Sequence, residues 1–197
     1  MIDEIISRQN FELVRDAIGS ILLIELESQK QKQGFDENIN IFSERTNPIQ
    51  NDELLTINLS LESGDFSNKT QKDSEGKTIY NIDIYTIGKS SPSGSGSNDS
   101  AFRLHKFIGM IRYILSHTAY RTLGLTPGFI GGSQIESFFI MDADLKQDSN
   151  YLKMARMTFS VRINENQSME NGVLIDESLA VVKLDETDLG FVYKFKN

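Results

Sequence analysis

The sequence predicts an α+β fold: an antiparallel or mixed sheet with two main helices packed on one face and long hairpin loops between strands. Two segments, 11–31 and 101–124, carry apolar residues at helical spacing, and the other segments alternate apolar and polar residues as half-buried strands do. The order is a helix, two or three strands, a second helix and further strands. Because this is neither a regular strand–helix alternation nor an all-strand pattern, an α+β arrangement is favoured.

The first helix is predicted over 11–31, FELVRDAIGSILLIELESQKQ. Asn10 is its candidate N-cap, and Gly34 lies just past its end. The apolar residues at helical spacing are Val14, Ala17 or Ile18, Ile21 and Leu22.

Alternating segments follow at 39–41, 55–61 and 78–88 and predict strands. In the third of them, Ile82 and Ile84 share one face, whereas Asn81 and Asp83 point to the other. Residues 64–77, GDFSNKTQKDSEGK, are polar and rich in turn formers, so a long hairpin loop is expected there.

The segment 90–100, SSPSGSGSNDS, has the composition of a flexible linker. It does not fit a phosphate-binding loop, because Asp99 stands where a third glycine is needed and no Gly-Lys-Ser/Thr follows. The second helix is expected after it, capped by Asp99 or Ser100 and ended by Gly124. Its apolar stripe is Leu104, Phe107, Ile108, Ile111, Leu115 and Thr118.

Three strand-like runs close the chain, at 133–142, 151–163 and 178–195, the last of them split near 186–188. We therefore expect two parts, an α+β domain over 1–165 and a C-terminal β extension over 166–197.

Composition excludes several function classes. The 197 residues have a formal net charge of −8 and a pI near 4.8, which argues against direct, sequence-specific nucleic-acid binding. No run of 18 apolar residues occurs, so no membrane span is expected, and the first residues, MIDEIISRQN, do not form a secretory signal pattern. The absence of cysteine excludes disulfides and thiolate metal sites.

No catalytic or metal-binding pattern is found. His105 and His117 lie twelve residues apart on the second helix, which places them about 120° apart and three turns distant. The loop 142–148 carries three aspartates, but Lys146 takes the fifth calcium-ligand position and the distal glutamate is missing. Without a nucleophile motif either, we expect no enzyme, no metal and no cofactor.

The segment 43–54 interrupts two apolar strands with a proline-stiffened loop that carries both signs of charge. Glu44 and Arg45 are adjacent, so they point apart and make a poor catalytic pair. Two interpretations remain, a solvated surface turn and an interaction surface. The candidate interface residues are Glu44, Arg45, Asn47, Pro48, Asp52 and Glu53.

The same segment carries a resemblance. The pattern F-x-E-R-x-x-P-[IL]-x-x-x-E-L is present as Phe42, Glu44, Arg45, Pro48, Ile49, Glu53 and Leu54. A strand at 80–85, a helix and a strand at 158–163 follow. Over residues 10–163 the chain resembles the tail terminator, or tail completion, proteins of long-tailed bacteriophages. It departs from them at Leu55-Thr56, where related sequences often have proline, and from about Gln167 onward, where no counterpart is recognised.

The resemblance implies a structural virion protein of the tail or neck, assembled in the host cytoplasm. Such proteins form a ring, typically a hexamer, that caps the tail tube, stops its polymerisation and joins it to the head connector or neck proteins. A head-to-tail ring needs two complementary surfaces on each subunit, and the charged loop would supply contacts to a neighbouring subunit or to the tube. The alternatives are another phage neck or tail-end protein, a small α+β ligand-binding domain, or an unrecognised enzyme.

Overall fold

The structure is a computed structural model that describes residues 8–35, 37–47, 49, 53–69, 73–89, 95–141, 146–147, 150–166, 177–183 and 190–196. The chain divides into two compact units, Met1–Gln167 and Ser168–Asn197. In the second unit, β7 (Glu177–Lys183) pairs antiparallel with β8 (Gly190–Lys196).

The described residues of the first unit form two α-helices, a short 3-10 helix and one sheet. Its elements in chain order are α1 (Asn10–Gln33), β1 (Ile39–Ser43), β2 (Leu55–Asn68), β3 (Asp73–Lys89), α2 (Gly96–Ser116), the 3-10 helix η1 (Thr118–Tyr120), β4 (Ile130–Met141), β5 (Lys146–Gln147) and β6 (Asn150–Asn166). The strand order is β1-β2-β3-β6-β4, and β5 also pairs with β6. Only β1 and β2 are parallel in this sheet, and its other pairs are antiparallel.

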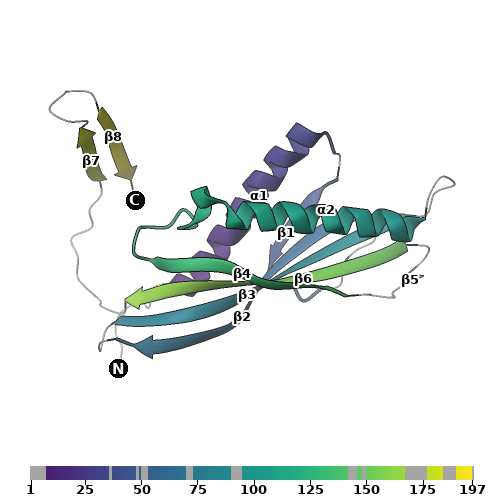
Figure 1. Cartoon of the computed structure of the whole chain (residues 1–197), viewed down its shortest axis with the longest axis horizontal. Coiled ribbons are helices and arrows are strands. Elements are labelled where there is room, and N and C mark those ends of the chain that lie inside the picture. The colour runs from purple at the N-terminus through teal and green to yellow at the C-terminus, as the bar shows by residue number, and fades with distance from the viewer. Residues whose placement is uncertain are drawn as a thin grey trace. The chain divides into compact units, whose positions relative to one another are not determined.

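Both helices cover one face of the sheet, as Figure 1 shows for α2 above β3 and β6. The α+β prediction is therefore confirmed. The predicted apolar stripes are buried: Ile18 on α1 and Ile111 on α2 are 0% exposed. They pack in one core with inward-facing strand residues such as Ile57, Ile84 and Phe159. Thr118 is exposed, because α2 ends at Ser116 rather than near Gly124.

Much of the predicted loop over 64–77 is instead a β-ladder, formed by residues 64–68 of β2 and 73–77 of β3. Strands β2 and β3 stay paired out to Asn68 and Ser74, and β6 pairs with the same part of β3 through Asp73 and Asn166. The Phe66 ring lies over its cross-strand partner Gly76, where an added Cβ would be 2.2 Å from the ring. Main-chain hydrogen bonds and this aromatic–glycine pair stabilise an exposed hairpin that has no buried apolar face. Because its strands do not alternate apolar and polar residues, the sequence pattern did not predict it.

The second half of the predicted linker over 90–100 is helical, and the N-cap is neither Asp99 nor Ser100. Helix α2 begins at Gly96, with Ser95 as N-cap, and residues 90–94 lie outside the described residues. A Cβ on Gly88 of β3 would lie 1.9 Å from the Gly96 carbonyl oxygen. The Thr86 hydroxyl donates to the Ser100 carbonyl at 2.8 Å. Glycine and serine therefore permit close packing between β3 and the first turn of α2.

Helix α1 begins one residue before the predicted range and is N-capped by Gln9 rather than Asn10. The Glu12 carboxylate accepts the Gln9 backbone N–H at 2.9 Å. Gly34 is the predicted C-cap: its φ is 64°, and its N–H donates to the Lys30 carbonyl at 3.0 Å.

Candidate functional site

Residues 44–54, which we call the crossover segment, connect the parallel strands β1 and β2. The chain must therefore return from the end of β1 to the level of its start before β2 begins. Ile39 and Ile41 of β1 face the helices, so Phe42 faces the opposite side, which we call the open face. The Arg45 guanidinium lies 4.3 Å from the centre of the Phe42 ring. The Arg45 backbone N–H donates to the Asn58 side-chain oxygen at 2.9 Å, and the Asn58 amide donates back to the Arg45 carbonyl at 3.2 Å. The start of the crossover segment is thus fastened to the open face.

Arg45 and Glu53 pair with each other inside this segment. Arg45 Nη1 and Glu53 Oε1 are 2.7 Å apart, and the two side chains are only 11% and 15% exposed. The hydrogen bond to Glu53 raises the pKa of Arg45 above its ordinary value. The sequence led us to expect these two charges at the surface. Instead, the two side chains are mostly shielded and join the beginning of the crossover segment to its end. The sequence of the loop does not show that these two residues meet.

Glu44 turns the chain out of β1. Its φ is 55°, and its backbone N–H donates to the Leu59 carbonyl at 2.9 Å. Its carboxylate accepts the Leu61 N–H at 2.8 Å and lies 3.5 Å from Arg15 Nη1. Among the described candidates, Glu44 and Asn47 are exposed and therefore accessible to a partner. Pro48 and Asp52 lie outside the described residues.

The described part of the chain shows no group of three or more histidine, aspartate or glutamate side chains that could hold a metal ion. The two histidines lie on or at the end of α2, and the His117 Nδ1 accepts the Ala119 N–H at 3.2 Å. Asp142, Asp144 and Asp148 lie outside the described residues. Among the described helices, none has the length and apolar character needed to cross a membrane.

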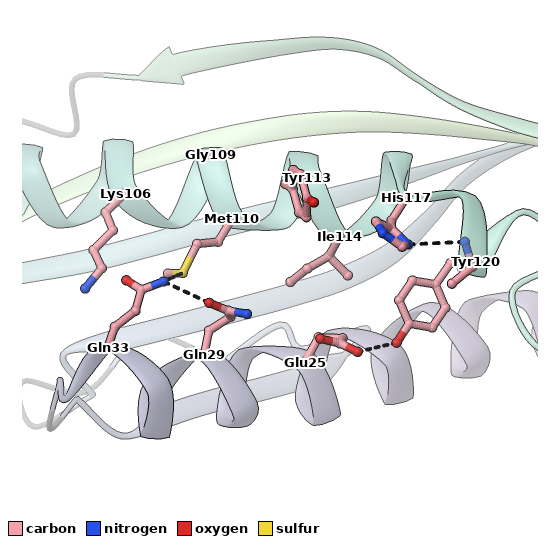
Figure 2. Close-up of a pocket in the computed structure, with 11 residues that line it drawn as sticks. Glu25, Gln29, Gln33, Lys106, Gly109, Met110, Tyr113, Ile114, His117 and Tyr120 are labelled. Carbon is pink, nitrogen blue, oxygen red and sulfur yellow. Dashed lines mark hydrogen bonds between the residues drawn. The ribbon is translucent and has the colours of Figure 1, made fainter.

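A groove of about 460 Å³ lies between α1 and α2 (Figure 2). The Tyr120 hydroxyl donates to the Glu25 carboxylate across its end, and this bond raises the pKa of Tyr120. Gln33 donates to Gln29 at 2.9 Å along the α1 wall. The lining residues are Glu25, Gln29, Gln33, Lys106, Gly109, Met110, Tyr113, Ile114, His117, Ala119 and Tyr120. Polar residues at four-residue spacing also occur on any solvated helix face, so the sequence did not reveal this groove.

Residues Ser137–Met141, the β4 edge segment, form the second feature that the sequence did not reveal. Strand β4 ends the sheet order, opposite β1. The segment contains no charged residue, and four consecutive apolar side chains are between 37% and 60% exposed: Phe138, Phe139, Ile140 and Met141. Alternation predicted a strand here, but the position of that strand at an edge depends on pairing with β6.

No protein-family model matches the chain, and no curated protein matches it. The assignment of function therefore depends on the sequence resemblance and on the surfaces just described. Of these, the crossover segment contains the residues that carry the resemblance except Phe42, which lies in β1.

Proposed function

We propose that the chain is a tail terminator of a long-tailed bacteriophage, a structural protein of the virion. In this role its copies form a ring, typically of six, that caps the tail tube and stops its polymerisation. The opposite side of the ring joins the head connector or neck proteins. The protein acts in the tail or neck after assembly in the host cytoplasm, without catalysis or a cofactor.

The observation that carries the proposal is that three residues of the shared pattern, Phe42, Arg45 and Glu53, contact one another. Arg45 stacks on Phe42 and pairs with Glu53, and Glu44 accepts a β2 backbone N–H. The pattern therefore has a structural reason to recur, since it builds the crossover between β1 and β2. A motif that specifies a fold element supports a resemblance in fold, and with it the structural role.

The candidate contact residues divide into two groups under this proposal. Arg45 and Glu53 hold the crossover segment in shape, whereas Glu44 and Asn47 are exposed and can contact a neighbouring subunit or the tube. Pro48 and Asp52 remain candidates from the sequence alone. Charge at such positions selects partner and register more than it adds affinity.

Complementation of a terminator-deficient phage tests the function. We expect the protein to restore tails of normal length that join heads, and its omission to give overgrown or headless tails. The mass of the purified protein, alone and with the tube protein, tests the ring. A protein that stays monomeric in both samples and restores no infectivity would overturn the proposal.

The groove between α1 and α2 favours a second candidate, a small ligand-binding domain. Its volume of about 460 Å³ is within the range of small-molecule sites, and it combines Met110 and Ile114 with polar groups from α1. A thermal-shift screen of small molecules distinguishes this candidate. Saturable stabilisation that Gly109→Trp abolishes would support ligand binding, because Gly109 faces open space in the groove.

A further inference from the structure

We infer that copies of this chain associate edge to edge, with β4 of one subunit pairing antiparallel with β1 of the next. The inference rests on the proposed ring and specifies the contact that builds it. The partner is a second copy of this chain, and the two surfaces involved are the opposite edges of the same sheet.

The pairing of β4 with β6 is irregular between Ile130 and Gly132 and between Ile135 and Ser137, so both irregularities precede the exposed end of β4. From Ser137 onward the strand is regular and its edge is unprotected. Natural edge strands usually carry charges, proline or bulges that prevent pairing with another chain. The β4 edge segment instead exposes Phe138, Phe139, Ile140 and Met141, at 47%, 60%, 46% and 37%. The nearest preceding charge, Glu136, is engaged by Lys77. Within the described part of the unit, no strand pairs with the outer side of β4.

The opposite edge has a matching character. Strand β1, Ile39–Ser43, reads INIFS and also lacks any charge. It is five residues long, which is the length of the β4 edge segment. Its outer side likewise pairs with no strand among the described residues of the unit. Each subunit therefore presents two different edges, the arrangement that a head-to-tail contact requires.

The two edges lie at the same level of the sheet. One row of cross-strand partners runs from Ile41 through Ile57, Ile84 and Ala155 to Ile140. The next row, on the open face, runs from Phe42 through Asn58, Asp83 and Arg156 to Phe139. If a second subunit is related to the first by rotation about an axis parallel to the strands, each row stays at the same height. The β1 strand of the second subunit then lies level with the β4 edge segment of the first, with no shift along the strands.

The strand directions also agree. One parallel and three antiparallel steps separate β1 from β4, so the two edge strands run in opposite directions. A rotation about an axis along the strands preserves direction, so β4 meets β1 of the neighbour in the antiparallel sense. Phe139 then lies beside Phe42 of the partner subunit on the open face. Ile140 lies beside Ile41 of the partner subunit on the helix face.

Cysteine cross-linking tests the pairing, because the chain contains no cysteine of its own. Ser43 and Phe138 are both exposed and lie at opposite ends of one row, through Leu59, Ile82 and Met157. Mild oxidation of the Ser43→Cys/Phe138→Cys protein should give a ladder of covalent oligomers. A mixture of the two single variants should give dimers only, and each variant alone should give none.

Two outcomes overturn the inference. Covalent dimers from Phe138→Cys alone would indicate a two-fold contact between β4 strands, which stops at a dimer. No cross-link in the double variant would exclude the stated register.

A charge on the edge gives an independent test. Phe139→Lys should weaken self-association about tenfold or more, the loss expected from an interface aromatic. Phe102→Lys on α2 is the matched control, since Phe102 is 75% exposed and belongs to neither edge strand. Both variants should keep the melting temperature of the monomer. A full-sized ring from Phe139→Lys would leave the ring proposal standing and remove the edge contact. Monomeric wild-type protein, alone and with the tube protein, would remove both.

Discussion

Asp83 of β3 and Arg156 of β6 form two parallel hydrogen bonds across the central ladder of the sheet. Arg156 Nε donates to Asp83 Oδ1 at 2.7 Å, and Nη2 donates to Oδ2 at 2.9 Å. The Asp83 side chain is only 5% exposed, although it lies on the open face, while Arg156 is 39% exposed. The pair raises the pKa of Arg156. The centre of the open face is therefore held by a specific charge pair as well as by backbone bonds.

Removing this arginine should destabilise the fold. Arg156→Ala leaves the Asp83 carboxylate buried without its fork of donors, so the free energy of unfolding should fall by about 2 kcal/mol. The loss stays below that of a fully buried pair because Arg156 is partly solvated. Urea denaturation measures it, with exposed Arg112→Ala on α2 as the control. Equal losses in the two variants would show that water satisfies Asp83.

Arg45 and Glu53 should behave as one unit. Arg45→Ala and Glu53→Ala should each lower the urea midpoint, because either change removes the ion pair between two poorly exposed charges. The double variant should lose less than the sum of the two. Asn47→Ala, at an exposed position of the same segment, should leave the midpoint unchanged. Strictly additive losses would mean that the pair is not coupled in solution.

Two glycines should respond oppositely to the same substitution. Gly88→Ala should lower the melting temperature strongly, since the new Cβ would lie 1.9 Å from the Gly96 carbonyl oxygen and must push α2 away from β3. Gly109→Ala is the control: its Cβ meets nothing within 4 Å, and alanine favours the helix by up to about 1 kcal/mol. Thermal unfolding of both variants is the measurement. An unchanged melting temperature for Gly88→Ala would exclude the close approach.

Glu165 should make stability depend on pH. Its two oxygens accept the backbone N–H groups of Asn10 and Phe11 at 3.1 Å each, and burial raises its pKa above the ordinary 4.5. The folded state then binds this proton more tightly than the unfolded chain does. Its ionisation therefore costs stability as pH rises from 4.5 through the folded pKa. Melting temperatures across this range should fall for the wild type relative to Glu165→Gln, and parallel curves would contradict the shift.

Local patterns predicted the parts of the fold that depend on local order. The stripe through Ile111 and the alternation through Ile57 and Ile84 were read correctly, since those side chains are 0% exposed. Apolar periodicity records which side of an element is buried, so it remains visible in one dimension. The C-cap at Gly34 was also predicted from local sequence, because a glycine just past a helical segment commonly adopts the left-handed conformation that ends a helix.

Pairing between distant segments could not be predicted. Asp83 and Arg156 are 73 residues apart, so nothing local marks Asp83 as paired. Because β1 and β2 are parallel, the chain must return from the end of β1 to the start of β2. Glu53, near the end of this return, pairs with Arg45 near its beginning. The exposed β4 edge segment looked like any other strand, because its edge position depends on where β6 pairs.

The place of β6 in the sheet sets an order of events during synthesis. Strand β6 pairs with β3 on one side and β4 on the other, yet both neighbours precede it in the chain. Until residue 166 has left the ribosome, β3 therefore lacks its partner on one edge, and β4 lacks the one strand that it pairs with in the described sheet. The β2–β3 hairpin and the helices can form locally, whereas the sheet can be completed only by insertion of the last long strand. A nascent chain stopped before Asn150 should consequently bind chaperones, and one that extends past the end of β6 should be released from them.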